Sequence, residues 1–230
     1  MLRSFLLITL RILWRNKVTS FVNIFSLSVG ITAFMFIMLY VLHETSYDKF
    51  HTNYHRIYRL EADEYGKLPP LIGNHVKDNV PEVENVAMFS NTDKGYFTYF
   101  PGKDPENKKQ IELRFSYADS STFDVFTFPF LHGDPSRALK EPMTAILAES
   151  AARKLFGSIN PIGLIVDFDH HPYMVSGVLK DVKSSHIEID ALLSIVSIAK
   201  LYPDRNLNET GPNSWLWSAT YLLMHDGVNE

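Results

Sequence analysis

The sequence predicts an α+β protein, in which one N-terminal transmembrane helix is followed by a periplasmic domain of mixed strands and helices. Residues 18–42 form an uninterrupted run without a charged side chain. Beyond that run, short strand patterns are mixed with isolated helical patterns and do not alternate strictly with them. Strict alternation is typical of α/β domains with parallel sheets, whereas this mixture is typical of α+β domains.

The apolar run predicts a helix that crosses the membrane and stays uncleaved. As an α-helix, residues 18–42 reach about 37 Å, enough for a hydrocarbon core of about 30 Å with some tilt. A buried helix of a soluble protein is seldom apolar on every face over this length. A cleaved signal peptide is the competing interpretation. The run exceeds the roughly 7–15 apolar residues of a signal sequence, however, and residues 40–44 contain no small-x-small cleavage site.

The distribution of charge predicts the orientation of this helix. Residues 1–43 contain four basic side chains and no acidic one, whereas all 26 acidic side chains of the protein lie further along the chain. The positive-inside rule therefore places the N-terminus in the cytoplasm and everything after about residue 43 in the periplasm, with the helix in the inner membrane. The acidic remainder has no basic stripe that could neutralise phosphates, so nucleic acid is not expected as a partner.

Residues 1–17 predict a cytoplasmic, amphipathic and basic leader. In a helix, polar and apolar side chains fall on opposite faces, with Ser4, Arg11 and Arg15 against Leu2, Leu6 and Leu13. Such a helix lies in the headgroup layer with Trp14 at interface depth, which makes membrane lipid a partner. The alternative is a plain basic leader to the span.

Within the span, five small or polar residues recur at spacings of four and three and share one face of the helix: Thr19, Asn23, Ser26, Gly30 and Ala33. Small side chains let two helix backbones approach in lipid, and Asn or Ser can hydrogen-bond across the contact. We predict that this packing seam faces a neighbouring helix. The alternative is that small residues are simply common in membrane helices.

The periplasmic core domain is predicted over residues 43–230. The period-two patterns predict strands at 57–63, 83–90, 95–100, 111–117, 144–147, 164–168, 173–179, 188–194 and 219–224. Helices are predicted at 69–79, which opens with prolines, and at 149–156, which Gly157 ends; residues 122–126 predict a short helix or turn. Residues 101–107 are rich in Pro, Gly and charge and are a possible boundary between two subdomains.

No pattern in the sequence predicts catalysis or a cofactor. Residues 167–171, DFDHH, could ligate a metal, but they fall where a hairpin must turn, and alternating strand positions point to opposite faces. Serine-nucleophile and phosphate-cradle signatures are absent. The sequence has no cysteine, which excludes disulfides and thiolate metal sites. We predict neither a catalytic nor a metal-binding residue.

A membrane-proximal motif follows the span and comprises Tyr47, Asp48, Phe50, His51, Arg56 and Tyr58. Its aromatic and basic side chains suit the interface between membrane and water, where it would stiffen the joint between span and domain. Ordinary packing at the base of the domain is the alternative.

Several runs, taken in order, resemble the permease subunits of MacB-type ABC transporters, which are related to FtsX and to lipoprotein-release permeases. The runs are LRILWRNK (10–17), YDKFH (47–51), RIYR (56–59), FTFPFLHGDP (126–135), ALKEP (138–142), ARKLFG (152–157), NPIG (160–163), VSGVLKDV (175–182) and SSH (184–186). They carry a structural motif of the periplasmic domain: Gly133, Asp134, Pro135, Pro142, Phe156, Gly157, Pro161, Gly163 and Gly177.

The resemblance implies a porter-like βαβ unit with an inserted subdomain, and a role without catalysis by this polypeptide. Such permeases pair as dimers with an ABC ATPase subunit and relay cytoplasmic ATP hydrolysis to the periplasmic domain for export or transfer of a substrate. They also carry three further spans, whereas no later run in these 230 residues is long enough to cross a membrane. A single-pass sensor or scaffold with an extracytoplasmic binding domain is the alternative function. A membrane-anchored hydrolase is a third, supported only by the histidines. The substrate is not indicated.

Overall fold

The computed structural model describes residues 11–61, 68–182, 185–203 and 218–228. The chain forms two compact units, Met1–Tyr47 and Asp48–Glu230. The first unit is dominated by one helix, and the second contains all the strands that the structure describes.

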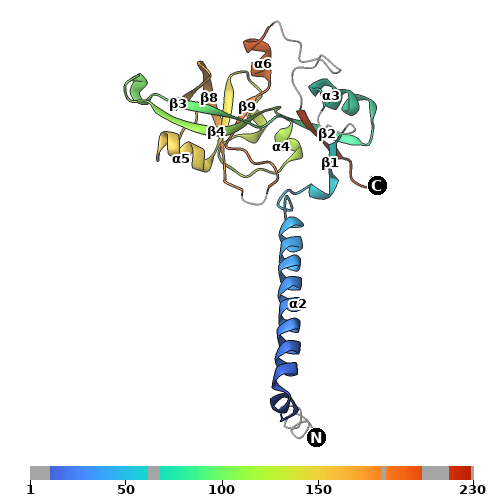
Figure 1. Ribbon diagram of the computed structural model, residues 1–230. Helices are drawn as coiled ribbons and strands as arrows, with labels where there is room; N and C mark the ends of the chain where they lie inside the picture. Colours follow the sequence, from blue (N-terminus) through green and yellow to red (C-terminus); the bar gives the residue numbers. More distant parts are fainter. Residues whose placement is uncertain (1–10, 62–67, 183–184, 204–217, 229–230) are drawn as a thin grey trace. The chain divides into compact units, whose positions relative to one another are not determined.

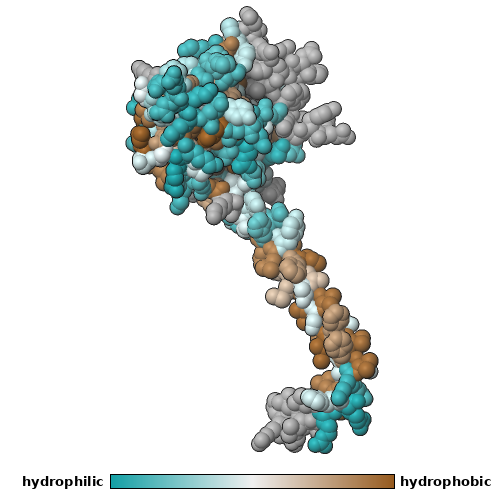
Figure 2. All heavy atoms as spheres, turned by 60° about the vertical axis from the view of Figure 1, so that its left-hand side comes forward, coloured by the Kyte–Doolittle hydropathy of each residue, from teal (hydrophilic) through white to brown (hydrophobic). Residues whose placement is uncertain are grey.

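Helix α2 (Lys17–Glu44) is continuous and is drawn in blue in Figure 1. None of its residues is buried, and apolar side chains cover it along most of its length (Figure 2). By length and composition α2 can cross a membrane, and it is the one such helix among the described residues. The helix predicted for residues 18–42 is therefore present, with its two charged end residues just outside the apolar run.

The leader is separated from α2 by a break at Asn16, which has φ −109° and ψ 54°. Residues 11–15 are helical, and the indole of Trp14 is 70% exposed. The Lys17 ammonium lies 5.8 Å from the centre of the Trp14 ring, which is a cation–π distance. Leu2, Ser4 and Leu6 lie outside the described residues, so the predicted two-faced leader remains a prediction.

The second unit is a mixed sheet with short helices (Figure 1). Its elements are η1 (Tyr54–Arg56), β1 (Ile57–Leu60), α3 (Pro70–Asn79), β2 (Val83–Ser90), β3 (Asp93–Tyr99), η3 (Pro101–Lys103), β4 (Lys109–Ala118), α4 (Thr122–Val125), β5 (Phe130–Gly133), η4 (Pro135–Arg137), β6 (Thr144–Ala148), α5 (Glu149–Phe156), β7 (Ile165–Phe168), β8 (His171–Leu179), β9 (Ala191–Ser194), α6 (Val196–Leu201) and β10 (Ser218–Met224).

The strands are ordered β1-β10-β2-β4-β3-β7-β8-β6-β9, and β5 pairs with β8. Because β9 also pairs with β4, the strands from β4 to β9 form a closed hydrogen-bonded circuit, from which β2, β10 and β1 extend. The pairs β4–β9 and β6–β8 are parallel, and the other pairs are antiparallel. The prediction of a mixed α+β domain is confirmed.

Two apolar cores lie on opposite faces of the central strands. Along β6, Ala145 and Leu147 belong to one core, and Ile146 between them belongs to the other. Leu192 alternates with its neighbours on β9 in the same way, as the two-residue period of a strand requires. Helix α5 covers the first core with Ala151, Ala152, Leu155 and Phe156, whereas Val125 of α4 belongs to the second.

The predicted hairpin between β7 and β8 is confirmed, with Phe168 paired to His171. Its two turn residues, Asp169 and His170, have φ values of 52° and 63°. Two consecutive left-handed residues are typical of the tight turns that match strand twist, and Asp and His tolerate that conformation better than most residues.

Residues 101–107 connect β3 to β4, which pair in register from Asp93–Phe115 to Tyr99–Lys109. The Pro, Gly and charge that suggested a subdomain boundary are therefore those of a hairpin connection, with Gly102 at φ 64°. Two short elements, β5 and α6, were not predicted, because neither segment shows a clear period of two or of 3.6 residues.

Candidate functional site

Three segments that lie far apart in the sequence meet at the beginning of the second unit. Residues 48–52 contact residues 126–128 and 185–187, and Tyr221 of β10 closes the group. We call Asp48, His51, Thr127, His186 and Tyr221 the entry cluster. The first two residues come from the predicted membrane-proximal motif, and the next two come from runs that carried the family resemblance.

Asp48 is the centre of the cluster. Its Oδ1 accepts hydrogen bonds from Ser185 Oγ (3.0 Å) and from the backbone N–H of His186 (3.2 Å), and its Oδ2 pairs with His186 Nδ1. Asp48 also has φ 58°, a left-handed conformation that costs a residue with a side chain about 1 kcal/mol or more. The hydrogen bonds hold the first residue of the domain in a conformation that it would otherwise avoid.

His186 links Asp48 to the sheet. Because a carboxylate can only accept, His186 donates from Nδ1 to Asp48, and its Nε2 hydrogen-bonds to the Tyr221 hydroxyl, 2.8 Å away. Hydrolases use the same order of carboxylate, imidazole and hydroxyl to activate a nucleophile. Here burial raises the pKa of Tyr221 above its usual value, so the phenol stays protonated. The arrangement can therefore fix the positions of the three segments.

His51 is 2% exposed and packs among the rings of Phe50, Phe126 and Phe128, at centroid distances of 3.9, 5.0 and 5.2 Å. Its Nδ1 accepts from the backbone N–H of Thr127 at 3.0 Å, so its Nε2 carries the proton of the neutral ring. That Nε2 is buried and has no hydrogen-bond partner among the described residues; Asp48 Oδ1 lies 4.0 Å away.

The pKa of His51 is lowered to about 4, chiefly because burial disfavours the charged imidazolium. The neighbouring Asp48 carboxylate raises this pKa, and His186 lowers it, each by less than the effect of burial. His51 is therefore a neutral donor at ordinary pH, held by its packing among aromatic rings and by one hydrogen bond.

Arg56 makes a second attachment between the first residues of the domain and the sheet. Its Nη1 donates to Glu84 Oε2 on β2 and to the carbonyl of Met224 at the end of β10, both at 2.8 Å. Its Nη2 donates to Asn53 Oδ1 at 3.1 Å, and its Nε lies 3.2 Å from an oxygen of Asp226. The guanidinium thereby joins η1 to β2 and to the residues that follow β10.

A cavity of about 240 Å³ opens beside the entry cluster. Its walls contain three aromatic rings, one carboxylate, one guanidinium and two imidazoles. They are formed by Asp48, His51, Tyr54, Ile57, Arg59, Phe126, His186 and Tyr221.

The structure places the residues of the predicted membrane-proximal motif in four different surroundings. Asp48, Phe50 and His51 contribute to the packing of the entry cluster, and Arg56 forms the separate attachment to β10. Tyr58 lies on β1 and is 37% exposed, whereas Tyr47 belongs to the first unit, where its ring lies 5.2 Å from that of His43. The burial of His51 agrees with the alternative interpretation of the motif, which is packing at the base of the domain.

Sequence patterns assign no role to three residues of the entry cluster, Thr127, His186 and Tyr221. Thr127 and His186 lie inside runs that carried the resemblance, which was the available signal. Tyr221 had no signal, because an aromatic residue in a strand is expected to pack and nothing local marks its hydroxyl for a histidine 35 residues away.

The residues of the structural motif lie mainly at chain reversals. Gly133 ends β5, Gly157 ends α5, and Gly163 occupies a turn in which the Leu164 N–H donates to the Pro161 carbonyl. These three glycines have φ values of 93°, 69° and 81°. Asp134 begins η4 before Pro135 by accepting from Ser136 at N and Oγ, bonds that lower the pKa of Asp134. Pro142 precedes β6, Phe156 is buried in the first core, and Gly177 lies in β8 against Phe130.

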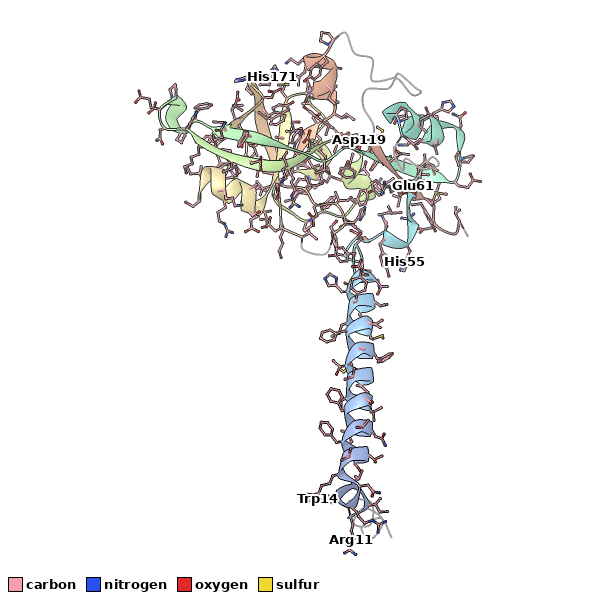
Figure 3. All side chains as sticks on the ribbon, viewed as in Figure 1. Arg11, Trp14, His55, Glu61, Asp119 and His171 are labelled. Atoms are coloured by element: carbon pink, nitrogen blue, oxygen red, sulfur yellow. The ribbon has the colours of Figure 1, made fainter. Side chains whose placement is uncertain are left out.

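The DFDHH run lies away from the entry cluster. Figure 3 shows His171 at the opposite end of the domain from His55, which lies in η1. Within the part of the chain that the structure describes, no group of three or more His, Asp or Glu side chains is arranged to hold a metal ion. Asp169 and His170 have the left-handed backbone conformation of a tight turn, which explains why these residue types occur there.

The five residues of the packing seam lie on the continuous helix α2, so they fall within about 80° of one another around its axis. Two other hydroxyls of α2 are satisfied within the helix: Ser28 donates to the Ile24 carbonyl and Thr32 to the Ser28 carbonyl, both at 2.7 Å. What the seam packs against remains a prediction.

Three solved structures resemble the chain. They are a domain of a proposed permease protein from Porphyromonas gingivalis (23% identity, TM-score 0.56, covering 71% of this chain and 65% of that one), the extracellular domain of the noncanonic ABC-type transporter YknZ from Gram-positive bacteria (18%, 0.52, 74% and 83%) and the periplasmic region of MacB from Actinobacillus actinomycetemcomitans (14%, 0.54, 76% and 76%). At these identities the likeness shows a shared fold. The chain spans less than two thirds of the first structure's length.

Similarity in sequence adds a family to this likeness of fold. No curated protein matches the chain. The model of one family, described as the MacB-like periplasmic core domain, matches residues 20–229, which is most of the chain. The protein thus belongs to the MacB-like periplasmic core domain family, whose solved relatives include domains of ABC-type transporter permeases.

Proposed function

We propose that this chain is part of the permease subunit of an ABC-type transporter, and that it relays cytoplasmic ATP hydrolysis from its apolar helix to its extracytoplasmic domain. The ATP would be hydrolysed by a separate ABC ATPase subunit, since nothing in this chain predicts a nucleotide site. The relayed movement would export or transfer a substrate that this sequence does not identify.

The observation that carries the proposal is how firmly the first residues of the domain are attached to its sheet. Asp48 follows the last residue of α2 by four positions, and its carboxylate reaches Ser185 and His186. His51 is buried among aromatic rings, and Arg56 bonds to β2 and to the end of β10. A displacement imposed at residue 48 would therefore be transmitted to the sheet and would not be lost in a flexible linker.

The remaining features of the proposal concern the membrane. The basic leader supports an inner-membrane protein with a cytoplasmic N-terminus and a periplasmic domain, in contact with membrane lipid. The seam from Thr19 to Ala33 supports packing of α2 against another membrane helix, in a homodimer or in a paired permease.

The test is purification of the tagged full-length gene product from its own membrane in mild detergent. We expect a nucleotide-binding subunit with a phosphate-binding loop to copurify and to confer ATP hydrolysis on the complex. An assembly that contains no ATPase would overturn the proposal in favour of a single-pass sensor or scaffold.

A matched pair of variants tests the packing seam in the same preparation. Gly30→Leu introduces a bulky side chain into the seam and is expected to reduce recovery of the second permease copy about tenfold. Phe21→Leu, on the face of α2 opposite Gly30, is expected to leave recovery unchanged. Equal recovery in the two variants would show that the seam is not a packing surface.

A further inference from the structure

Asp48 Oδ1 has more hydrogen-bond donors within reach than it can satisfy. A carboxylate oxygen offers about two acceptor positions, and both are used by Ser185 Oγ and the N–H of His186. The Nε2–H of His51 lies 4.0 Å from the same oxygen, and it is buried with no hydrogen-bond partner among the residues that the structure describes. A bond from His51 to this oxygen therefore requires that Asp48 release at least one of the other two donors.

We infer that the entry cluster is a two-position switch, in which the Asp48 carboxylate exchanges Ser185 and His186 for His51 as its hydrogen-bond partners. In the docked position, which the structure shows, residues 185 and 186 are held and His51 is not. In the exchanged position, His51 Nε2–H is satisfied and the segment around His186 is released from Asp48.

Each position leaves something unsatisfied, which keeps the two close in free energy. The docked position leaves the buried His51 Nε2–H without a partner in the described part of the chain and holds Asp48 at φ 58°. The exchanged position takes the Asp48 acceptor away from the buried Ser185 hydroxyl, whereas the released His186 side chain is 42% exposed and can bond to water. A small displacement can shift the equilibrium between two arrangements that are close in free energy.

The surroundings permit the exchange. The Asp48 carboxylate and the His51 ring both border the 240 Å³ cavity, so the carboxylate can turn without displacing the core. The His51 ring itself is held in place by Phe50, Phe126 and Phe128 and by the Thr127 N–H, so it offers a fixed target. His186 in turn contacts Tyr221, so release of His186 changes the hydrogen bonding of β10.

This inference deepens the proposed relay, because it names the residues that respond first when α2 displaces residue 48. It predicts that a pull on the chain before Asp48 favours one partner set over the other. The signal would then leave the cluster in two directions, along the segment after Ser185 and along β10 through Tyr221.

Two substitutions of His51 separate its two hydrogen bonds. His51→Asn keeps an acceptor where Nδ1 receives the Thr127 N–H and removes the donor that faces Asp48. His51→Gln keeps a donor at the Nε2 position and weakens the contact with Thr127. The readout is hydrogen exchange of the His186 amide in the full chain, reconstituted in lipid nanodiscs without any ATPase.

We expect the His186 amide to exchange about tenfold more slowly in His51→Asn than in the wild type, because the exchanged position has lost its partner. His51→Gln is expected to stay near the wild-type rate. Equal rates in His51→Asn and the wild type would overturn the switch.

A second measurement needs no variant. The imidazole nitrogens of His51 and His186 in the wild-type chain are expected to show coupled exchange broadening between two states, and a single static environment for both would also overturn the switch. Because both measurements use the chain alone, they can succeed when no ATPase copurifies. They can also fail when an ATPase does copurify, so the switch and the proposed function are tested separately.

Discussion

Lowering the pH from 7 to 4 is expected to remove about 3 kcal/mol of folding stability through His51 alone, because its pKa falls from 6.5 to about 4 on folding. In the unfolded chain the imidazole takes up a proton as the pH drops through about 6.5. In the folded domain the buried ring stays neutral until about pH 4. Between these values the unfolded state binds more protons, so stability falls with falling pH, and below about 4 the loss is constant.

The measurement is urea unfolding of the full chain in detergent at several pH values between 4 and 7, compared with His51→Asn. The comparison is needed because Asp119 acts in the opposite direction. Burial raises the pKa of Asp119 to about 6, so its folded form takes up a proton first and gains stability as the pH falls. Asp119 is common to both proteins, and the difference between the two curves isolates His51. Parallel curves would mean that His51 is not buried as a neutral ring.

Replacing Gly133 with alanine is expected to destabilise the domain by about 3 kcal/mol or more, for two reasons that act together. Gly133 has φ 93°, which a residue with a side chain adopts only under strain. A Cβ added there would lie 2.5 Å from the Ser176 carbonyl oxygen and 2.9 Å from Gly177 Cα. Both are backbone atoms of the paired strand β8, which cannot move aside without breaking the β5–β8 pairing.

Gly163→Ala is the matched control for this prediction. Gly163 also has a positive φ, 81°, but a Cβ there would have no other atom within 4 Å. We expect only the conformational cost of about 1 kcal/mol. Urea midpoints of the two variants against the wild type give the comparison. If the two variants lose the same stability, the close approach of β5 to β8 contributes nothing.

Local signals in the sequence predicted most of the elements. The helix from Pro70 to Asn79, with its proline start, and α5 before Gly157 were bounded by residues whose backbone preferences act within one turn. The β7–β8 hairpin was likewise marked by its turn residues. The elements that escaped prediction, β5 and α6, are short and take their conformation from the strands and cores they contact.

The entry cluster could be predicted only in part, because its contacts are long-range. The motif that begins at Tyr47 suggested a belt at the membrane interface. The same aromatic and basic residue types occur at a membrane surface and at the base of a domain, so the sequence does not distinguish the two. The burial of His51 is decided by Phe126 and Phe128, which lie 75 residues or more further along the chain. Nothing local to His51 reports that contact, and nothing local to Tyr221 reports the histidine it bonds.

The proposed relay needs a domain that lies outside the cytoplasm and is driven from inside it, and single-cysteine labelling tests this topology. The protein has no cysteine, so one introduced thiol is the only reactive one. Tyr96→Cys replaces a side chain that is 61% exposed on β3, and Asn16→Cys lies in the break before α2. With a membrane-impermeant maleimide on spheroplasts, the account predicts that position 96 is labelled at once and position 16 only after the membrane is permeabilised. Labelling of position 16 in intact spheroplasts, or protection of position 96, would contradict it.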